Sequence, residues 1–291
     1  MRGKRILKGC GVLVLIFIVL VAIGAVIEAM KKGGVLGVGR QVAVVPLEGV
    51  IIDSRKVVEQ LDDFRRDPAV RALVIRIDSP GGAVAPSQEI YEAIQRVDKE
   101  KPVVASLGSV AASGGYYAAI GARKIVANPG TVTGSIGVII EFVNLEEVLA
   151  WAKIKQETIK SAQYKDIGSP FRKLENTERE LLQKLVDDIH SQFVEAVANC
   201  RKMSIEDVRK LANGLVYTGK QAVTLKLIDE LGDLNRAIKL AGELAGIKGE
   251  PEVIYPPEPF FKFKDLFGKA EEMLDAMKGF SNVRILYLWR I

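Results

Sequence analysis

Ser113 stands at a position in the sequence where a nucleophilic serine could be held. It follows the apolar run Val103–Leu107 and precedes a short helical stretch through Ala118 and Ala119, with only alanine and glycine beside it. A serine between a strand end and a helix start can face a cleft in the positive field of the helix N-terminus. The Ala-Ser-Gly-Gly sequence also suits a simple helix cap or a tight turn, so this pattern by itself leaves both interpretations open.

A second glycine-rich turn could supply hydrogen-bond donors to the same reaction. The segment Asp78–Gly82, with the sequence Asp-Ser-Pro-Gly-Gly, ends an apolar run and leads into a predicted helix. Exposed backbone N–H groups can stabilise the oxyanion of a tetrahedral intermediate, and losing one such donor typically costs about 3 kcal/mol in the barrier. A strand-to-helix turn that merely needs glycine would have the same spacing.

The few histidines and cysteines exclude several other kinds of site. The one histidine, His190, lies in a predicted long helix beside its apolar stripe and is expected to be a partly buried helix residue. A Ser-His-Asp triad or a histidine-based metal site would have to rest on it. Cys10 and Cys200 offer neither a disulfide framework nor a metal-ligand spacing. Hydrolysis would need another base, and no metal or organic cofactor is expected.

Short apolar runs alternate with longer amphipathic stretches from residue 41 onward. Two of these stretches, Val57–Arg65 and Ser87–Val97, predict helices. Five runs predict strands, several of them of the continuous Val/Ile/Ala kind that is buried on both faces: Val42–Pro46, Ala72–Ile77, Val103–Leu107, Ile125–Ala127 and Ile136–Ile140. Strand and helix in alternation predict an α/β core with parallel strands.

The second half of the chain is predicted to be mainly helical. A long helix is expected to open at a capping box, Thr177–Glu180. Its apolar stripe suits either the core or a subunit contact and consists of Leu181, Leu182, Leu185, Ile189, Phe193 and Val197. Shorter helices are predicted at Ser204–Leu211, Thr218–Leu225 and Leu234–Leu244, and the composition changes beyond Pro251 into a C-terminal extension, residues 251–291.

An apolar segment near the N-terminus predicts a membrane anchor. Residues 9–27 carry no charge and would span about 28 Å as a helix, close to the ~30 Å of a hydrocarbon core. The basic cluster in residues 1–8 favours a cytoplasmic N-terminus, with residues 28–40 as a linker to a body outside the cytoplasm. The competing interpretation is a cleavable signal, with Ala22 and Gly24 as the small residues before a cut.

The net charge of +5 comes mostly from this N-terminal segment. Four of the 41 basic residues stand in residues 1–27 with no acid, which leaves 37 basic against 36 acidic side chains in the rest of the chain. A protein that binds nucleic acid shows a concentrated basic footprint. Nucleic acid is therefore not an expected partner.

Six segments, taken together, resemble the signal peptide peptidase A family, within the larger group of peptidases that share the crotonase fold with Clp protease. They occur in that family's order and are Ile75–Gly82, Ser109–Tyr117, Thr131–Gly137, Tyr164–Asp166, Tyr217–Ala222 and Leu227–Gly232. The resemblance implies a crotonase (ClpP)-like α/β peptidase domain over residues 41–250. One departure is Lys226, where the family usually has glycine, and it puts only that local turn in doubt.

The resemblance also assigns roles to individual residues. It implies that Ser113 is the nucleophile and Lys165 the general base, that Ser135 hydrogen-bonds the lysine amine, and that the N–H groups of Gly82 and Gly114 form the oxyanion hole. Lysine, with a reference pKa near 10.4, is a poor base at neutral pH unless apolar surroundings hold it neutral. Only the resemblance separates Lys165 from the other lysines nearby, which are Lys153, Lys155 and Lys160.

The function implied is that of a single-pass, membrane-anchored serine endopeptidase that hydrolyses remnant signal peptides after their release. Such substrates are apolar and extended. A homo-oligomeric ring is also implied, in which the lysine of one subunit completes the site around the serine of its neighbour. Two alternatives stay open. One is an acyl-CoA enzyme of the same fold, which the exported location and the Ser/Lys pair argue against, and the other is a catalytically silent membrane scaffold.

Overall fold

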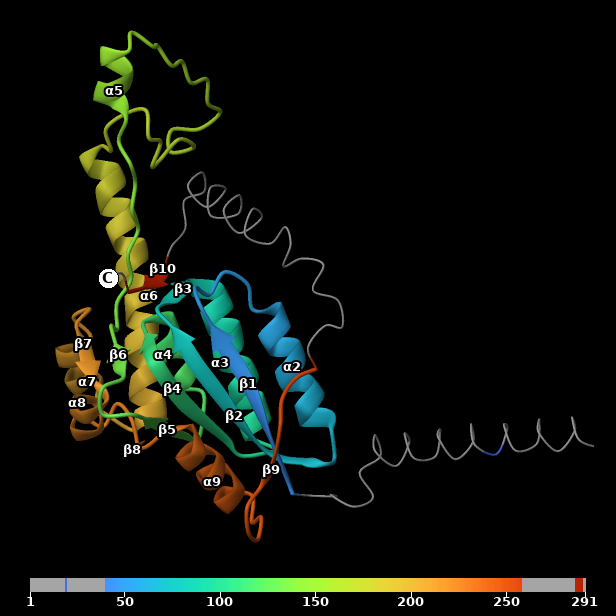
Figure 1. The fold of residues 1–291 in the computed structure, drawn as a ribbon. Helices are drawn as coiled ribbons and strands as arrows, with labels where there is room; N and C mark the ends of the chain where they lie inside the picture. Colours follow the sequence, from blue (N-terminus) through green and yellow to red (C-terminus); the bar gives the residue numbers. More distant parts are fainter. Residues whose placement is uncertain (1–18, 20–39, 258–285, 290–291) are drawn as a thin grey trace, which may run out of the picture.

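The computed structural model describes residue 19, residues 40–257 and residues 286–289 (Figure 1). The predicted anchor at residues 9–27 apart from residue 19, almost all of the linker and most of the C-terminal extension therefore lie outside the described residues. Within the described part of the chain, no helix is long and apolar enough to cross a membrane. The anchor and the domain boundaries stay predictions.

A mainly parallel sheet forms the centre of the fold. Its strands are β1 (Gln41–Glu48), β2 (Val70–Ser79), β4 (Val103–Ala112), β5 (Lys124–Ala127), β6 (Val132–Gly134), β7 (Val216–Thr218), β8 (Glu230–Leu231) and β9 (Glu252–Ile254). The order is β7-β6-β4-β2-β1-β9, with β5 beside β4 and β8 beside β5. Neighbouring strands run parallel except β6 and β7. A separate antiparallel pair joins β3 (Gly81–Ala83) to β10 (Leu286–Leu288).

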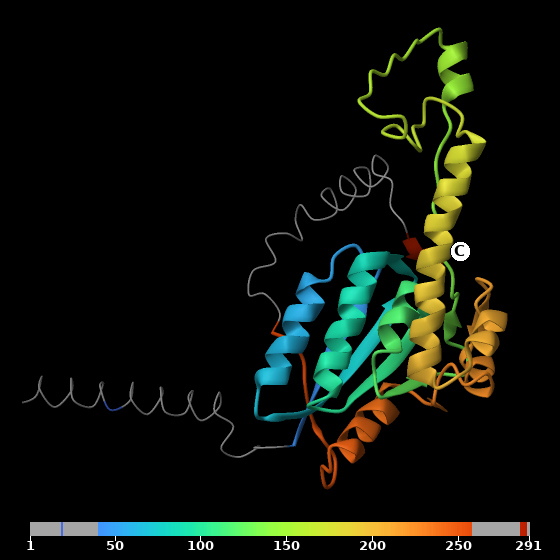
Figure 2. The ribbon, with the colours of Figure 1, turned by 180° about the vertical axis from the view of Figure 1, so that it is seen from behind.

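Helices cover both faces of this sheet (Figures 1 and 2). The helices α2 (Arg55–Arg66), α3 (Val84–Asp98) and α4 (Gly114–Ala119) lie on one face, and α9 (Leu234–Leu244) packs on the other. Along β1, Ala43 and Val45 pack in the core between the sheet and α2, α3 and α4, whereas Val42 and Val44 pack in the core between the sheet and α9. The two sets separate because successive side chains of a strand point to opposite faces. Burial on both faces explains why the central strands are continuous apolar runs.

The long helix α6 (Asn176–Arg201) links the body to a projecting arm. We define the arm as residues 141–175, which include α5 (Glu146–Trp151) and lie beyond the body at the N-terminal end of α6 (Figures 1 and 2). The apolar stripe of α6 is divided accordingly, since Phe193 is fully buried in the core and Leu185 is 42% exposed near the arm. The helices α7 (Ile205–Leu211) and α8 (Gly219–Thr224) follow α6.

Most predicted elements are confirmed, and the strand predicted at Ile136–Ile140 is wrong. The preceding strand β6 ends at Gly134, and Ser135 then has a φ of 52°. A residue in this left-handed region turns the chain out of the extended conformation. In the predicted stretch Ile139 makes only an isolated bridge, to Leu286. Residues 136–139 of this apolar run line a cavity instead of forming a strand.

The capping box predicted at Thr177–Glu180 is also wrong, because the helix begins two residues earlier, with Glu175 as its N-cap. The Glu178 carboxylate accepts a hydrogen bond from the Glu175 N–H at 3.0 Å, so Glu178 occupies the third helical position. Glu178 is 2% exposed and paired with Arg172. This partly buried ion pair holds the start of α6 in place.

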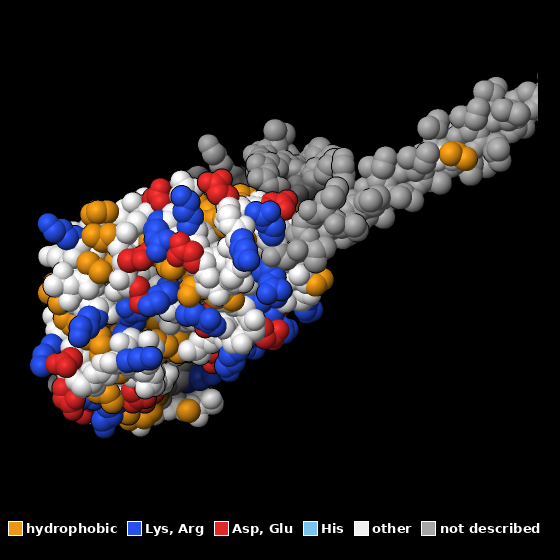
Figure 3. All heavy atoms as spheres, turned by 90° about the horizontal axis from the view of Figure 1, so that it is seen from below, with side chains coloured by type: hydrophobic (Ala, Val, Ile, Leu, Met, Phe, Trp, Pro, Cys, Tyr) orange, Lys and Arg blue, Asp and Glu red, His pale blue; other side chains and the backbone are white. Residues whose placement is uncertain are grey.

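Charged side chains of both signs are mixed on the face shown in Figure 3. On the described surface, ion pairs such as Arg65 with Glu100 and Arg123 with Asp98 balance neighbouring charges. Exposed pairs of this kind contribute little to stability. The mixture on the face of Figure 3 agrees with the near-neutral composition of the chain beyond its N-terminal segment.

Candidate active site

Ser113 occupies a sharp turn between β4 and α4. Its backbone has φ 52° and ψ −115°, and its residue is 1% exposed. The Ser113 N–H donates to the Gly134 carbonyl and its own carbonyl accepts from the Tyr117 N–H, both at 2.8 Å. A non-glycine residue in such a conformation costs about 1–3 kcal/mol and is held there by its surroundings. This is the geometry of a strained strand-to-helix turn that presents a nucleophile.

Two glycines place backbone N–H groups beside this turn. A methyl group on Gly114 would lie 3.2 Å from the Gly82 nitrogen and 2.5 Å from Ser87 Oγ, so the two glycines approach each other too closely for side chains. The neighbouring Gly81 N–H is already used, because it donates to Ser79 Oγ at 3.1 Å. The Gly82 and Gly114 N–H groups are therefore the pair that the structure brings together next to Ser113.

Ser135 is brought to the same place by strand pairing. Gly134 lies opposite Ala112 in the parallel pair of β6 and β4, one residue before Ser135 and Ser113 respectively. Ser135 is 7% exposed, and its N–H donates to the Leu215 carbonyl at 2.8 Å. It lines a cavity of ≈ 470 Å³ whose wall also includes His190, Asn213 and Trp289.

Lys165 lies apart from these residues in the single chain. It is exposed, and it stands in the turns of the arm, where its N–H donates to the Ala162 carbonyl at 3.2 Å. Both ribbon views show the arm beyond the body that holds α4 (Figures 1 and 2). Of the five predicted site residues, the structure brings together Ser113, Ser135, Gly82 and Gly114 and leaves Lys165 outside that group.

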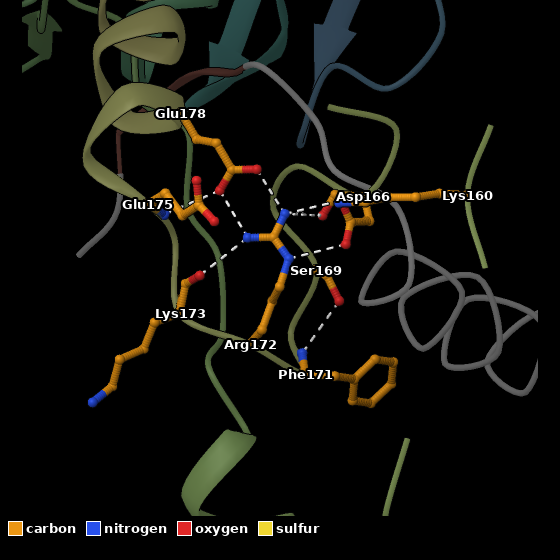
Figure 4. A network of polar contacts seen from close by, with 8 residues as sticks. All are labelled: Lys160, Asp166, Ser169, Phe171, Arg172, Lys173, Glu175 and Glu178. Atoms are coloured by element: carbon orange, nitrogen blue, oxygen red, sulfur yellow. Dashed lines mark hydrogen bonds and ion pairs between the residues drawn. The ribbon is translucent and has the colours of Figure 1, made fainter. Parts of the chain in front are cut away.

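Asp166, the residue after Lys165, is linked through Arg172 to Glu178 at the start of α6. Arg172 donates from Nε to Asp166 Oδ2 and from Nη2 to Asp166 Oδ1, both at 2.9 Å. Figure 4 shows its guanidinium between Asp166 and Glu178, whose carboxylate it bonds at 2.6 and 2.8 Å. Lys160 adds a bond to Asp166 Oδ1 at 2.6 Å. The network fixes the loop that carries Lys165 relative to α6.

These contacts lower the pKa values of both carboxyl groups. Hydrogen bonds from Arg172 hold the pKa of Glu178 down at about 2, and bonds from Arg172 and Lys160 hold the pKa of Asp166 below its usual range. A carboxylate whose pKa is lowered on folding adds stability above its unfolded pKa, and loses it as the pH falls through the folded value. The network is therefore expected to be fully formed at neutral pH.

The Arg172→Lys variant is expected to loosen this loop. Lysine keeps the charge but cannot make the two parallel bonds of a guanidinium, so cleavage of the arm by an added protease should become about tenfold faster at neutral pH. Limited proteolysis with mass spectrometry of residues 152–174 measures this rate. The matched control is Arg66→Lys, in an exposed pair with Asp63, which should leave arm cleavage unchanged. Equal rates for the two variants would contradict the role of the network.

Several residues around the site were not predicted from the sequence. Ser79 donates to the Gly49 carbonyl at 2.6 Å, and Ser87 donates to the Ala83 carbonyl at 2.8 Å, so both hold the glycine turn in place. Ser79 lies within the Asp-Ser-Pro-Gly-Gly segment, which was a usable signal, whereas nothing local marks Tyr287, which pairs with Gly82. His190 is half-buried in α6, as predicted, and its Nε2 has no partner among the described residues.

The chain matches the model of peptidase family S49 over residues 95–248 and the Clp protease model over residues 50–131. The Synechocystis sp. protein "Putative protease slr0021" is 41% identical over 227 residues, or 77% of this chain and 82% of that protein. The chloroplastic serine protease SPPA of Arabidopsis thaliana is 35% identical over 222 residues, or 76% of this chain and 32% of that protein.

A third relative is the Enterococcus faecium "Putative signal peptide peptidase SppA", which is 37% identical over 174 residues, or 60% of this chain and 51% of that protein. With a parallel α/β sheet, a Clp-like segment and a serine on a strained turn, the chain is a serine-type peptidase. It belongs to peptidase family S49. The predicted resemblance to signal peptide peptidase A is thereby confirmed.

Proposed function

We propose that this peptidase is a membrane-anchored endopeptidase that hydrolyses remnant signal peptides, with Ser113 as nucleophile and Lys165 as general base. The observation that carries the proposal is the position of Ser113 on its strained turn, with the N–H groups of Gly82 and Gly114 next to it. The name of the Enterococcus relative supports the substrate class. The apolar segment at residues 9–27 supports the anchor, with the catalytic body outside the cytoplasm.

The proposed chemistry uses only groups of the protein and water. Ser113 Oγ attacks the peptide carbonyl carbon while its proton passes to the neutral Lys165 amine, and the Gly82 and Gly114 N–H groups stabilise the oxyanion that forms. The ammonium then protonates the leaving amine as the C–N bond breaks. Water, deprotonated by Lys165, hydrolyses the acyl-enzyme and regenerates Ser113. The Ser135 hydroxyl orients the lysine amine throughout.

In this proposal Lys165 reaches Ser113 of a neighbouring copy in a ring. The arm carries Lys165 away from its own body, and it exposes apolar side chains that a neighbour could cover (Figure 1). These side chains are Val143 (62% exposed), Val148 (58%), Trp151 (86%), Ile154 (57%) and Ile159 (97%). An exposed apolar set of this kind marks a protein contact surface. A neighbour packed there would also remove Lys165 from water, which a neutral lysine base requires.

A fluorophosphonate probe tests the nucleophile directly. We expect stoichiometric labelling of the native enzyme at Ser113, because the probe phosphorylates an activated serine hydroxyl. Tandem mass spectrometry of the labelled peptide identifies the site. Ser109→Ala is the matched control, since Ser109 is exposed in the same segment and should be dispensable. Labelling on another serine, or none on a native oligomer, would refute the assignment.

A reporter fused after residue 291 tests the membrane topology. A reporter that works only outside the cytoplasm should be active in this fusion, because the basic side chains within residues 1–8 favour a cytoplasmic N-terminus. The same fusion without residues 1–27 is the control and should be inactive. Activity of a reporter that works only in the cytoplasm, fused to the full chain, would show that the orientation is wrong.

A further inference from the structure

A pocket opens at the edge of the sheet that lies opposite the arm. It has a volume of ≈ 520 Å³, and its wall includes Arg71, Glu100, Lys101 and Leu244. These residues come from the start of β2, the turn before β4 and the end of α9, and Figure 1 shows those ends at the bottom of the body, with the arm at the top. β4 runs from this edge to Ser113, and its ten residues, at roughly 3.3 Å each, place the catalytic turn about 30 Å away.

Two cations and one carboxylate line this pocket. Lys101 is half-buried, and its ammonium donates to two backbone carbonyl groups, at 2.5 and 2.8 Å. An ammonium has three N–H donors, so one is left to bond a ligand. Arg71 is exposed, and its guanidinium makes no hydrogen bond or ion pair with the described residues. The Glu100 carboxylate, by contrast, is already paired with Arg65 at 2.8 Å.

The surroundings of Lys101 destabilise its positive charge. Burial lowers the pKa of Lys101 below its ordinary value, and the charge of Arg71 acts in the same direction. Asp67 and Glu100 oppose this shift without cancelling it. A cation in such a place is stabilised by a bound anion, because a nearby opposite charge favours the charged form. A guanidinium beside an ammonium suits the oxygens of a phosphate group in particular.

Further basic residues adjoin the pocket at the start of β1. Gln41 lies opposite Val70 of β2, which places Arg40 beside the pocket. The Arg40 guanidinium donates to the Lys248 carbonyl at 3.0 Å, and neither side chain forms an ion pair with a described residue. The acidic Glu252 belongs to β9, on the side of β1 away from β2. The basic edge therefore continues to the residue that precedes the first strand.

The sequence places this basic edge next to the predicted membrane anchor. The anchor ends at residue 27, and the twelve residues 28–39 join it to Arg40. A glycine-rich linker of that length spans about 20 Å as a flexible coil and at most about 40 Å when fully extended. The bilayer that holds the anchor is therefore within reach of the pocket.

We propose that Arg71 and Lys101 bind the phosphate group of an anionic phospholipid in this pocket, and that the body docks by this edge on the bilayer that its anchor enters. The inference rests on the anchor in the proposed function and not on the chemistry of Ser113. A lipid suits the pocket better than free phosphate, because Leu244, which is 37% exposed, offers an apolar surface beside the charged wall. Tethering holds the pocket near the headgroups at an effective concentration of about millimolar, so even a weak site is occupied.

Amide hydrogen exchange of the full-length protein in lipid nanodiscs tests the docking. Discs of phosphatidylcholine alone are compared with discs that also contain phosphatidylglycerol, whose headgroup is anionic. Exchange in residues 66–72 and 98–104 should be about fivefold or more slower in the phosphatidylglycerol discs, because a bound headgroup opposes local opening of the pocket wall. Exchange in α7, on another part of the body, should be the same in both kinds of disc.

Three variants locate the effect in the pocket. Arg71→Gln/Lys101→Gln should abolish the slowing, and Arg71→Gln alone, which changes only an exposed side chain, should reduce it to less than about twofold without affecting the fold. The matched control is Lys184→Gln/Arg209→Gln, which removes one lysine and one arginine from exposed positions on α6 and α7 and should keep the full slowing. An equal loss in the control would mean diffuse attraction to the bilayer and would overturn the pocket assignment.

Inorganic phosphate added to the phosphatidylcholine discs separates the two sources of the anion. It should change exchange in the pocket segments by less than about twofold, and a slowing equal to that with phosphatidylglycerol would overturn the lipid assignment. Equal exchange in the two kinds of disc would overturn the docking itself. Fluorophosphonate labelling at Ser113 in the same discs keeps the proposals distinguishable, because labelled protein without slowing overturns the docking alone. Protein that does not enter the discs would remove the anchor and the docking together.

Discussion

Replacing Ser113 with alanine is expected to lower kcat/KM for a peptide substrate by about ten-thousand-fold or more, while the variant still binds the substrate. The change removes the attacking oxygen, but the Gly82 and Gly114 N–H groups stay in place. Stopped-flow kinetics measures the loss and fluorescence anisotropy the binding. Ser109→Ala, which removes an exposed hydroxyl four residues earlier, should keep native kinetics. Activity within tenfold of native in Ser113→Ala would overturn the assignment.

The backbone at Ser113 offers a second control that separates activity from stability. Alanine at a φ of 52° is strained just as serine is, whereas glycine adopts this conformation freely. Ser113→Gly should therefore be as inactive as Ser113→Ala, and its folded state should be more stable by about 1 kcal/mol through relief of that strain. Thermal unfolding of the two inactive proteins measures the difference. Equal midpoints would show that the turn at Ser113 stores no strain.

The sequence predicted the buried layers well because burial leaves a local pattern. β4 is predicted from Val103–Leu107, where both faces of the strand are covered and every residue except Ser106 is apolar. Ile136–Ile140 has a similar composition but is not a strand, because the backbone turns at Ser135. The amino-acid composition of a segment indicates whether it is buried. It does not reveal a single residue whose positive φ turns the backbone out of a strand.

The site residues that follow the end of a strand could be predicted from the sequence. The residues that reach the site through contacts between distant parts of the chain could not. Ser113 and Gly82 each follow a strand, and parallel strands bring such ends together at one edge of a sheet. Tyr287 enters the same site from the far end of the chain, through pairing with Gly82 that no local sequence signal specifies. The position of Lys165 is a harder case, because the described part of the chain holds Ser113 in the body and Lys165 on the arm, and no local sequence signal specifies what the arm contacts.

Mixing two inactive proteins is therefore expected to restore activity. Ser113→Ala subunits keep Lys165, and Lys165→Ala subunits keep Ser113. If each site takes its serine from one copy and its lysine from the next, random mixed rings at equal amounts should contain intact pairs at about a quarter of their sites. The expected activity per site is then about a quarter of native. It should decrease when either variant is present in excess over the other. Peptide hydrolysis after subunit exchange, with mixing verified by native mass spectrometry, measures this curve.

Dilution of the native protein with a Ser113→Ala/Lys165→Ala double variant provides the matched control. In a shared site, activity depends on two independent subunits, so it should follow the square of the native fraction and reach about a quarter at equal amounts. In a site closed within one chain, activity follows the native fraction itself and stays at about half. A linear curve, together with no recovery in the first mixture, would mean that the arm folds back onto its own body and that Lys165 meets Ser113 within one subunit. The quadratic curve would instead explain why the single chain holds Ser113, Ser135 and the two glycines together and carries its lysine outward.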